Sequence, residues 1–395
     1  NICKKHLLTL LVPIGILTLG LSACHDAYDQ PESASSAEQA LLSKLQHYYD
    51  DLPGQSRSGN SISIKEIEQR HYVIVDDTVV ETPQTRTLDP NSFDITRVSL
   101  NIDGKEGFAI ISEDERLDHV YYFTDNGCIS DTAQIEGLKW LIDEMPNFAA
   151  AELVSNEPIT RATLPDISIA PIVRFKWGQG YPFNILTPYC SCSSCDNDVF
   201  KKHNPVGGLT VAVAQTIATL GKFDGTYFGS RNINFATLPS KSEDFSSMLG
   251  QEIAHFFHEV AVGCQIWFGC VNDFENANNS GGHLQAARNY LRDMQYDCFS
   301  VEADINIEIL LNELKRGIPH IISGSRYIVR PTWIIDGIKI KDGVCTYSCN
   351  WGNYGKSNGW IYGNPYTKIY KNPDTGQTSL LSYDMHIENL YINSK

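Results

Sequence analysis

The stretch NPVGGLTVAVAQ, from Asn204 to Gln215, decides how the C-terminal half of the chain folds. Two glycines are followed by a run of apolar and small residues, which predicts a buried helix that begins at about Gly208. The N-terminus of a helix is also where a protein can lower the pKa of a nucleophilic thiol. This helix begins on glycine, which has no side chain to attack a carbonyl, so the sequence leaves open whether the chain is an enzyme.

The residues around this stretch, 161–395, form the second of two predicted domains. Apolar spacing predicts helices at residues 208–220, 248–262, 283–294 and 306–317. Further along, Asp342 and Gly343 lie between alternating apolar residues, which predicts a β-hairpin. Helices first and an antiparallel sheet later indicate an α+β fold of two lobes with a cleft between them.

The preceding residues, 41–160, form a smaller predicted α+β module. Short runs of β-forming residues at 72–77, 97–102, 107–112 and 119–124 predict strands separated by polar and glycine-containing turns. Residues 131–145 have helical spacing, with Asp131 as the expected N-cap. The polar segment 155–166 predicts a joint between the module and the C-terminal domain.

The N-terminus has the pattern of an exported bacterial lipoprotein. Two lysines precede an apolar run too short to span a membrane as a helix, and the sequence LSAC ends at Cys24. We therefore expect residues 1–24 to be a lipoprotein signal peptide, Cys24 to carry the lipid and residues 25–40 to be a polar tether. This predicts a protein of the outer membrane or cell surface that contacts the membrane through its lipid anchor only.

The net charge indicates which partners to expect, and the cysteine count indicates whether disulfides can form. The formal net charge is −16 and no basic block follows the signal, so we expect no nucleic-acid partner. Of eleven cysteines, nine remain once Cys3 and Cys24 are set aside. An exported protein can form disulfides, and an odd number leaves at least one cysteine outside intramolecular pairs. The spacing does not determine which cysteines pair.

Four stretches of the C-terminal part follow one another in a suggestive order: KWGQGYPFN at 176–184, NPVGGLTVAVAQ at 204–215, RPTWIIDG at 330–337 and YSCNWGNYGKSNGW at 347–360. Together they resemble the streptopain family of secreted papain-like cysteine peptidases, which are made as precursors with an N-terminal prodomain. The resemblance extends from about Phe108 to Trp360. It implies a papain-like two-lobe domain over residues 161–395, preceded by a prodomain-like module over residues 41–160.

The resemblance also assigns positions to the family's site residues. Gln179 matches the glutamine of the oxyanion hole. Asn350 matches the asparagine that orients the histidine, and Trp351 matches the tryptophan that shields it. Gly208 stands at the position of the nucleophilic cysteine and Pro331 at that of the histidine, but neither residue type can attack a carbonyl or move a proton. The resemblance therefore implies a homologue that has lost its catalytic pair.

The remaining histidines offer no clear replacement for Pro331. The spacing of the two histidines in HFFHE, residues 255–259, differs from that of a zinc peptidase. His320 lies on a strand expected beside that of Pro331, and would reach the cleft only if both its position and its face were right. The pattern C-x-C-x-x-C at residues 190–195, with His203 nearby, is a weak zinc signal.

Three functions remain open. We expect an inactive homologue that binds a peptide or protein in the cleft, without a cofactor or a metal ion. The first alternative is an active cysteine endopeptidase with a displaced nucleophile such as Cys190, Cys192 or Cys195, although these residues lie in a polar loop and not at a helix start. The second alternative is a purely structural surface lipoprotein.

Overall fold

A computed structural model describes residues 36–54, 61–76, 78–83, 89–155, 165–223, 233–270, 280–325, 330–363 and 386–393. The chain divides into two units, Asn1–Ala40 and Leu41–Lys395, and the description below concerns the second. The predicted signal peptide, Cys24 and most of the predicted tether lie outside the described residues. No helix in the described part of the chain has the length and apolar character that a membrane crossing requires.

One sheet dominates the second unit. Its order is β2-β1-β3-β4-β5-β11-β10-β9-β8-β12-β7, with β6 paired to β9, and the strand pairs of the described residues are antiparallel. The strands of the N-terminal part are β1 (Ile62–Val75), β2 (Thr78–Thr82), β3 (Ser92–Ile102), β4 (Lys105–Ile111) and β5 (Val120–Thr124). Those of the C-terminal part are β6 (Ile167–Ile169), β7 (Asp297–Glu302), β8 (His320–Ser325), β9 (Thr332–Lys341), β10 (Val344–Asn350), β11 (Gly359–Tyr362) and β12 (His386–Asn393).

The two predicted domains share this sheet. Strand β5 of the module pairs with β11 of the C-terminal part, with Phe123 opposite Trp360 and Tyr122 opposite Ile361. Much of the predicted joint between the domains, residues 156–164, lies outside the described residues. The four strands predicted for the module correspond to β1, β3, β4 and β5. Strand pairing between the two parts therefore fixes the module against the C-terminal part.

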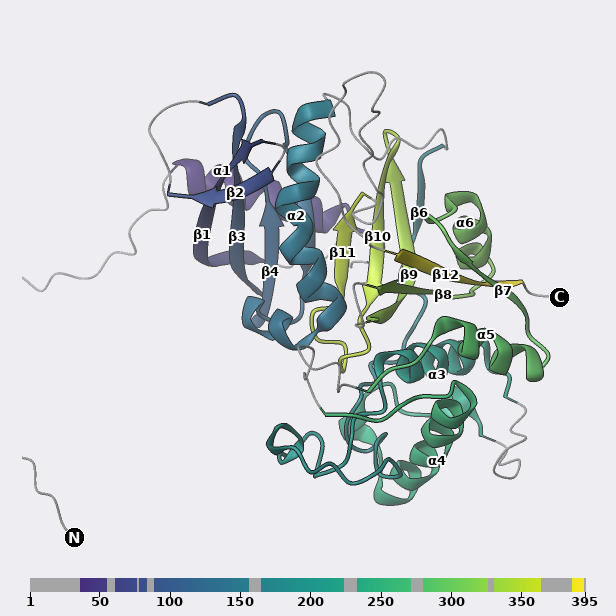
Figure 1. The fold of residues 1–395 in the computed structure, drawn as a ribbon. Coiled ribbons are helices and arrows are strands. Elements are labelled where there is room, and N and C mark those ends of the chain that lie inside the picture. The colour runs from purple at the N-terminus through teal and green to yellow at the C-terminus, as the bar shows by residue number, and fades with distance from the viewer. Residues whose placement is uncertain are drawn as a thin grey trace, which may run out of the picture. The chain divides into compact units, whose positions relative to one another are not determined.

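Two helices of the module lie on opposite faces of the sheet (Figure 1). Helix α1 (Ser36–Asp50) begins inside the predicted tether, because Leu41, Leu45 and Tyr49 recur at helical spacing and are buried against β3, β4 and β5. Helix α2 (Glu136–Ser155) packs against the other face, in a core shared with β4, β5, β9 and β10. Helix α1 was not predicted, because its first residues have the polar composition of a linker.

Helix α2 begins later than the sequence predicts. A short 3₁₀ helix, η1 (Ile129–Gln134), precedes it, and the Asp131 carboxylate accepts a hydrogen bond from the Cys128 backbone N–H at 3.1 Å. Asp131 therefore caps η1, and its prediction as the N-cap of the α-helix is wrong. The physical reason is that helical spacing continues through a 3₁₀ turn, so periodicity alone does not locate the change of helix type.

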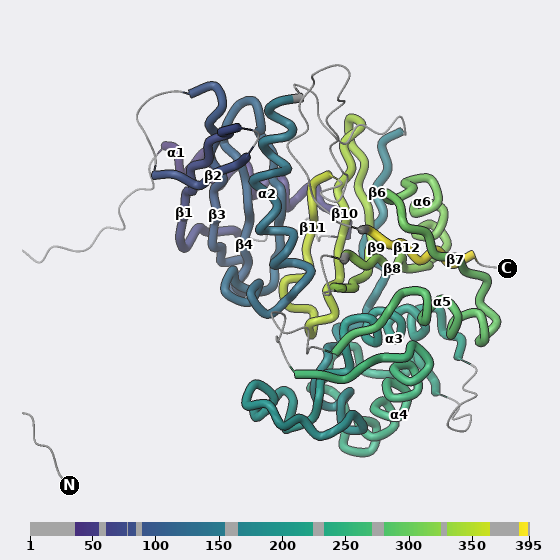
Figure 2. The backbone as a smooth tube through the Cα atoms, in the orientation of Figure 1, coloured from purple at the N-terminus to yellow at the C-terminus, as the bar shows by residue number. Residues whose placement is uncertain are grey.

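The predicted helices of the C-terminal part are all present. They are α3 (Gly208–Leu220), α4 (Ser247–Gly263), α5 (Leu284–Asp293) and α6 (Ile307–Lys315). Helices α3, α4 and α5 lie together beside the part of the sheet that contains β8, β9 and β12 (Figure 2), and share a hydrophobic core with it. The predicted hairpin is confirmed as β9–β10, where Asp342 and Gly343 both have positive φ, 52° and 80°.

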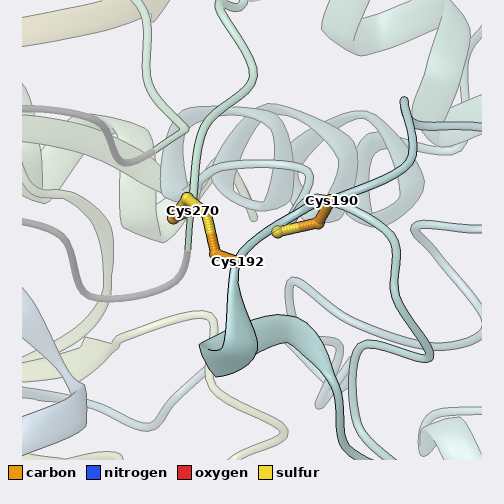
Figure 3. Close-up of side chains that lie close together, drawn as sticks. All are labelled: Cys190, Cys192 and Cys270. Atoms are coloured by element: carbon orange, nitrogen blue, oxygen red, sulfur yellow. A yellow bond between two sulfur atoms is a disulfide. The ribbon is translucent and has the colours of Figure 1, made fainter.

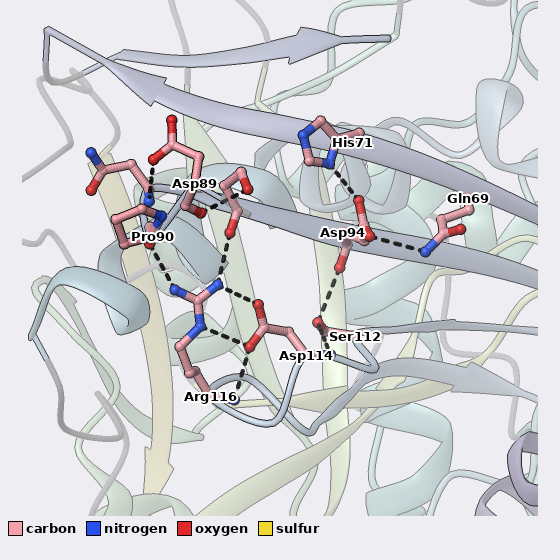
Figure 4. Close-up of polar contacts among 10 residues, drawn as sticks. Gln69, His71, Asp89, Pro90, Asp94, Ser112, Asp114 and Arg116 are labelled. Atoms are coloured by element: carbon pink, nitrogen blue, oxygen red, sulfur yellow. Dashed lines mark hydrogen bonds and ion pairs between the residues drawn. The ribbon is translucent and has the colours of Figure 1, made fainter. Parts of the chain in front are cut away.

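A polar network fixes the turn that leads into β3 (Figure 4). The Arg116 guanidinium donates to the backbone carbonyls of Pro90 and Ser92 at 2.7 and 2.8 Å, and the Asp114 carboxylate accepts from it. That guanidinium lowers the pKa of Asp114. Beside it, a His71 ring nitrogen lies 2.7 Å from the Asp94 carboxylate. Arg116 and Asp114 are thus paired within the module, and neither of them lines the cavity around Gly208.

Candidate functional site

A cavity of about 640 Å³ brings most of the predicted site residues together. Gln179, Gly208, Pro331 and Trp351 all line it, although more than 170 residues separate the first from the last. Asn350, the fifth predicted residue, lies beside it with 1 % of its surface exposed. Since the predicted positions come from four separate stretches of sequence, their convergence places the cleft where the sequence pattern predicted it.

The loop that carries Gln179 is shaped by Tyr354. A Cβ atom on Gly178 would lie 2.4 Å from the Tyr354 ring, and one on Gly180 would lie 2.6 Å from its hydroxyl. The Gly180 backbone N–H donates to that hydroxyl at 2.7 Å, and the Tyr354 N–H donates to the Trp177 carbonyl at 3.1 Å. The two glycines of WGQG thus allow a tyrosine to lie across the loop and hold Gln179 at the cavity wall. No sequence pattern indicated this role for Tyr354.

Gly208 is the first residue of α3, as predicted. The helix is capped by Gly207, whose φ of 85° favours glycine, and its next ten residues are buried. A Cβ atom on Gly208 would lie 3.2 Å from the carbonyl oxygen of Thr332, the residue after Pro331. Gly208 therefore lies close to the start of β9, which directly follows Pro331, and both residues line the cavity.

Pro331 stands directly before β9. Its carbonyl oxygen accepts hydrogen bonds from the Gly324 N–H at 3.0 Å and from the Ser323 hydroxyl at 3.1 Å. Proline has no N–H to donate, and this position at the start of a strand is one that tolerates it. On the next strand, Asn350 pairs with Ile334. Asn350 is thus on a strand adjacent to β9, as predicted, but Pro331 lies one residue before β9 and not on it.

The Asn350 side chain is fully engaged within the protein. Its amide N–H group donates to the Gln215 side-chain oxygen at 2.7 Å and to the Phe175 carbonyl at 3.3 Å, and its own oxygen accepts from the Gly352 N–H at 3.0 Å. Gln215 is completely buried in α3 and donates in turn to the Trp177 carbonyl at 3.4 Å. Asn350 therefore links the end of β10 to α3 and to the Gln179 loop.

The Trp351 indole closes the cavity on the side of the N-terminal module. It lies 5.5 Å from the Trp333 ring, centre to centre, and its N–H donates to the Tyr122 hydroxyl at 3.3 Å. A Cβ atom on Gly137 would lie 3.1 Å from both indoles. The start of α2 therefore packs directly on the two tryptophans, and a glycine permits that close approach.

Comparison with known proteins identifies the domain that holds this site. Residues 177–361 match the model of the peptidase C10 family. The predicted similarity to the streptopain family, which this model describes, is confirmed over these residues, and we call them the C10 domain. No curated protein sequence matches the chain.

Two solved structures of Prevotella intermedia proteins are similar to the chain. A fragment of prointerpain A with one cysteine-to-alanine substitution has 17 % identity and a TM-score of 0.58, and covers 85 % of this chain and all of that one. Active wild-type interpain A, a cysteine protease, has 18 % identity and a TM-score of 0.42, over 59 % of this chain and 96 % of that one. The first similarity confirms the predicted fold, a papain-like C10 domain with an N-terminal prodomain region.

The module contributes an acidic wall to the cavity of the C10 domain. Asp131, Gln134 and Glu136 line it from η1 and the start of α2. Burial raises the pKa of Glu136 to about 8, and one of its carboxylate oxygens is buried without a hydrogen-bond partner among the described residues. Across the cavity stand Arg330 and Lys356. No sequence signal identified these residues, because the module and the C10 motifs are far apart in the chain.

The cysteine loop forms another wall of the cavity. Cys190 is bonded to Cys195. Cys192 is bonded to Cys270 (Figure 3), and Cys270 itself lines the cavity. A thiolate is the attacking species in cysteine catalysis, and a sulfur in a disulfide is not one. The structure therefore does not support Cys190, Cys192 or Cys195 as a displaced nucleophile.

Among the described residues, no cysteine with a free thiol and no histidine lines the cavity. The free cysteines of the described residues are Cys128, Cys264, Cys298, Cys345 and Cys349, and none of them lines the cavity. His320 is completely buried, where its ring nitrogens lie 2.9 Å from a Glu313 oxygen and 3.0 Å from the Asn389 oxygen. It holds α6, β8 and β12 together and does not reach the cleft.

Proposed function

We propose that this chain is a C10-family homologue without peptidase activity that binds a peptide or protein segment in its cleft. One observation carries the proposal. Gly208 and Pro331, to which the resemblance assigns the nucleophile and histidine positions, both line the cavity, and among the described residues no free thiol and no histidine lines it. Acyl transfer to a thiol needs both a thiolate and a proton-transferring partner.

The polar groups that remain at the cavity wall can bind a peptide. Gln179 stands at the cavity wall beside the N-terminus of α3, so a side-chain amide and backbone N–H groups are available to a substrate carbonyl oxygen. Contacts along a peptide do not depend on the nucleophile. The cleft can therefore hold a peptide although it lacks the groups that would cleave it.

The N-terminal module stays part of the binding site in this proposal. Members of the family remove the prodomain largely by their own activity, a route that Gly208 closes. Gln134 and Glu136 then form a permanent wall of the cavity. We expect purified protein to remain full length during incubation.

The test of activity compares four proteins on unfolded casein with a thiol reductant. The unmodified protein and Gly208→Cys should show no thiol-dependent cleavage above background, because Pro331 supplies no imidazolium to lower the thiol pKa. Gly208→Cys/Pro331→His should cleave about a hundredfold faster than Gly208→Cys, the usual size of a general acid–base contribution. The matched control is Gly208→Ala/Pro331→His, which has the histidine but no thiol.

Binding is tested with the unmodified protein and peptides of casein, by calorimetry. Gln179→Ala should weaken binding by about three- to tenfold, the value of one hydrogen bond to a carbonyl. Reductant-dependent cleavage of casein by the unmodified protein, blocked by iodoacetamide, would show that the chain is an active peptidase and overturn the proposal.

We also propose that the protein is exported and anchored through Cys24. The support is the lipobox-like LSAC and the polar residues that follow it. Cells grown with a labelled fatty acid should incorporate label into the protein, and Cys24→Ser should abolish it. Equal labelling of both proteins, or of neither, contradicts the anchor.

A further inference from the structure

Two disulfides lie close together beside the cavity, and Cys270 of one of them lines it. The sulfur atoms of Cys190, Cys192 and Cys270 all lie within 4.8 Å of one another (Figure 3). The sulfur of Cys195 is outside this group of three but is bonded to that of Cys190, so the four cysteines form one cluster. Cys190, Cys195 and Cys270 are buried, with Phe200 packed beside them.

Backbone hydrogen bonds within residues 190–202 hold the cysteines of this loop close together. The Cys190 N–H donates to the Lys202 carbonyl at 2.8 Å, and the Lys202 N–H donates to the Cys195 carbonyl at 2.9 Å. Within the loop, the Cys195 N–H donates to the Cys192 carbonyl at 3.1 Å, which closes a C-x-x-C turn. The two cysteines of this turn are not bonded to each other, because Cys192 is bonded to Cys270 and Cys195 is bonded to Cys190. A C-x-x-C turn of this kind can direct two sulfurs at one metal ion.

The spacing also matches a tetrahedral thiolate site. With a Zn–S distance of about 2.3 Å, the sulfurs of a tetrahedral four-cysteine site lie about 3.8 Å apart. Three of the sulfurs here already lie within 4.8 Å of one another, so small side-chain rotations would bring them to that distance. Burial of three of the cysteines excludes water, as in a structural site with four protein ligands.

We propose that, when its two disulfides are reduced, this cluster binds one Zn²⁺ ion through Cys190, Cys192, Cys195 and Cys270. Each disulfide takes two electrons and two protons from a dithiol reductant, which becomes a disulfide itself. The ion then binds four thiolates, and the four thiol protons pass to solvent. This inference does not depend on the proposed peptide binding.

The consequence concerns the cleft, because the cluster supports one of its walls. Ser194, Asn197 and Asp198 of the same loop line the cavity together with Cys270. Reduction without metal would release the loop from Cys270, whereas a bound ion would restore the connection. The same cavity wall would then be held either by the two disulfides or by a metal ion.

The test uses the full protein, reduced with a dithiol, freed of reductant without oxygen and titrated with Co²⁺. We expect one equivalent to bind with the visible absorption of tetrahedral cobalt and an intense thiolate-to-metal band, and Zn²⁺ to displace it. Cys192→Ser and Cys270→Ser should each lower the affinity by about tenfold or more and remove about a quarter of the thiolate band. Cys128→Ser, outside the cluster, is the matched control and should bind as the parent does.

A second measurement needs no variant. Zinc added to the reduced parent should protect these four cysteines from alkylation by iodoacetamide, as located by peptide mass mapping. Three results would each overturn the proposal: less than about 0.1 equivalent bound by the reduced protein, an octahedral spectrum without a thiolate band, or protection that is absent at these cysteines.

Discussion

Asn350, predicted from the resemblance to orient a histidine, makes its hydrogen bonds to other groups in this structure. Its amide group bonds to Gln215, Phe175 and Gly352 in a buried setting. The side chain therefore has partners for both its nitrogen and its oxygen without a histidine. A buried amide with three partners is costly to replace, because its partners would be left unpaired. Packing thus explains its presence without any catalytic role.

Glu136 gives a prediction about pH. Burial raises its pKa to about 8, whereas an unfolded chain would release the proton near the ordinary value of 4.5. Its contribution to stability is therefore fully present below about pH 4.5 and is lost as the pH rises through about 8. Glu136→Gln should accordingly gain stability relative to the parent across this window, measured as the free energy of unfolding in urea from about pH 5 to about pH 9.

The difference between parent and variant is the quantity to follow. Burial also raises the pKa of Asp336, to about 7, but Asp336 titrates in both proteins and cancels in the difference. Glu115→Gln, at an exposed position of the module, serves as the control and should follow the parent. A Glu136→Gln difference that does not change with pH would show that the carboxyl is already ionised in the folded protein.

Among the elements, the β9–β10 hairpin positions both Pro331 and Asn350. Its turn residues, Asp342 and Gly343, have φ angles of 52° and 80°, and the strands pair directly from Lys341 and Val344. A turn of this hand matches the twist of the strands and fixes their register. A slip by one residue would turn the side chains of either strand to the opposite face.

The turn gives the second prediction. Gly343→Ala should lower the free energy of unfolding by about 1 to 2 kcal/mol, because a residue with a Cβ atom is strained at positive φ. Asp342→Asn should change it by less than about 0.5 kcal/mol, since asparagine adopts this conformation readily. Urea denaturation measures both. Equal stability of Gly343→Ala and the parent would mean that the turn relaxes to another conformation.

In the whole molecule, strand pairing, hydrogen bonds and side-chain packing all join the module to the C10 domain. Strand β5 pairs with β11, the Trp351 indole donates to the Tyr122 hydroxyl, and the start of α2 packs on Trp333 and Trp351. The core around α2 is continuous with that of β9 and β10. Strand pairing and a shared core both couple the two parts energetically.

This coupling predicts a single unfolding transition. With the disulfides intact, tryptophan fluorescence and far-UV circular dichroism should give urea midpoints that agree within about 0.2 M, because neither part can expose its share of the joint core alone. Hydrogen exchange measured on peptide fragments reports whether the module unfolds at the same urea concentration as the rest of the chain. Earlier unfolding of residues 61–155 by either method would show that the module is an independent unit.

The sequence by itself determined many of the elements and the resemblance to the family. Helical spacing located α3 to α6, the Asp342-Gly343 pair located the hairpin, and the order of Gln179, Gly208, Pro331 and Asn350 located the cleft. These features depend on local spacing and on motifs within short stretches, so they can be read along the chain. Tertiary structure alone decided which distant side chains meet: Glu136 in the cavity, Tyr354 across the Gln179 loop, Gln215 beside Asn350 and the pairing of Cys192 with Cys270. The physical reason is that such contacts depend on how whole elements pack together. No local sequence pattern encodes that packing.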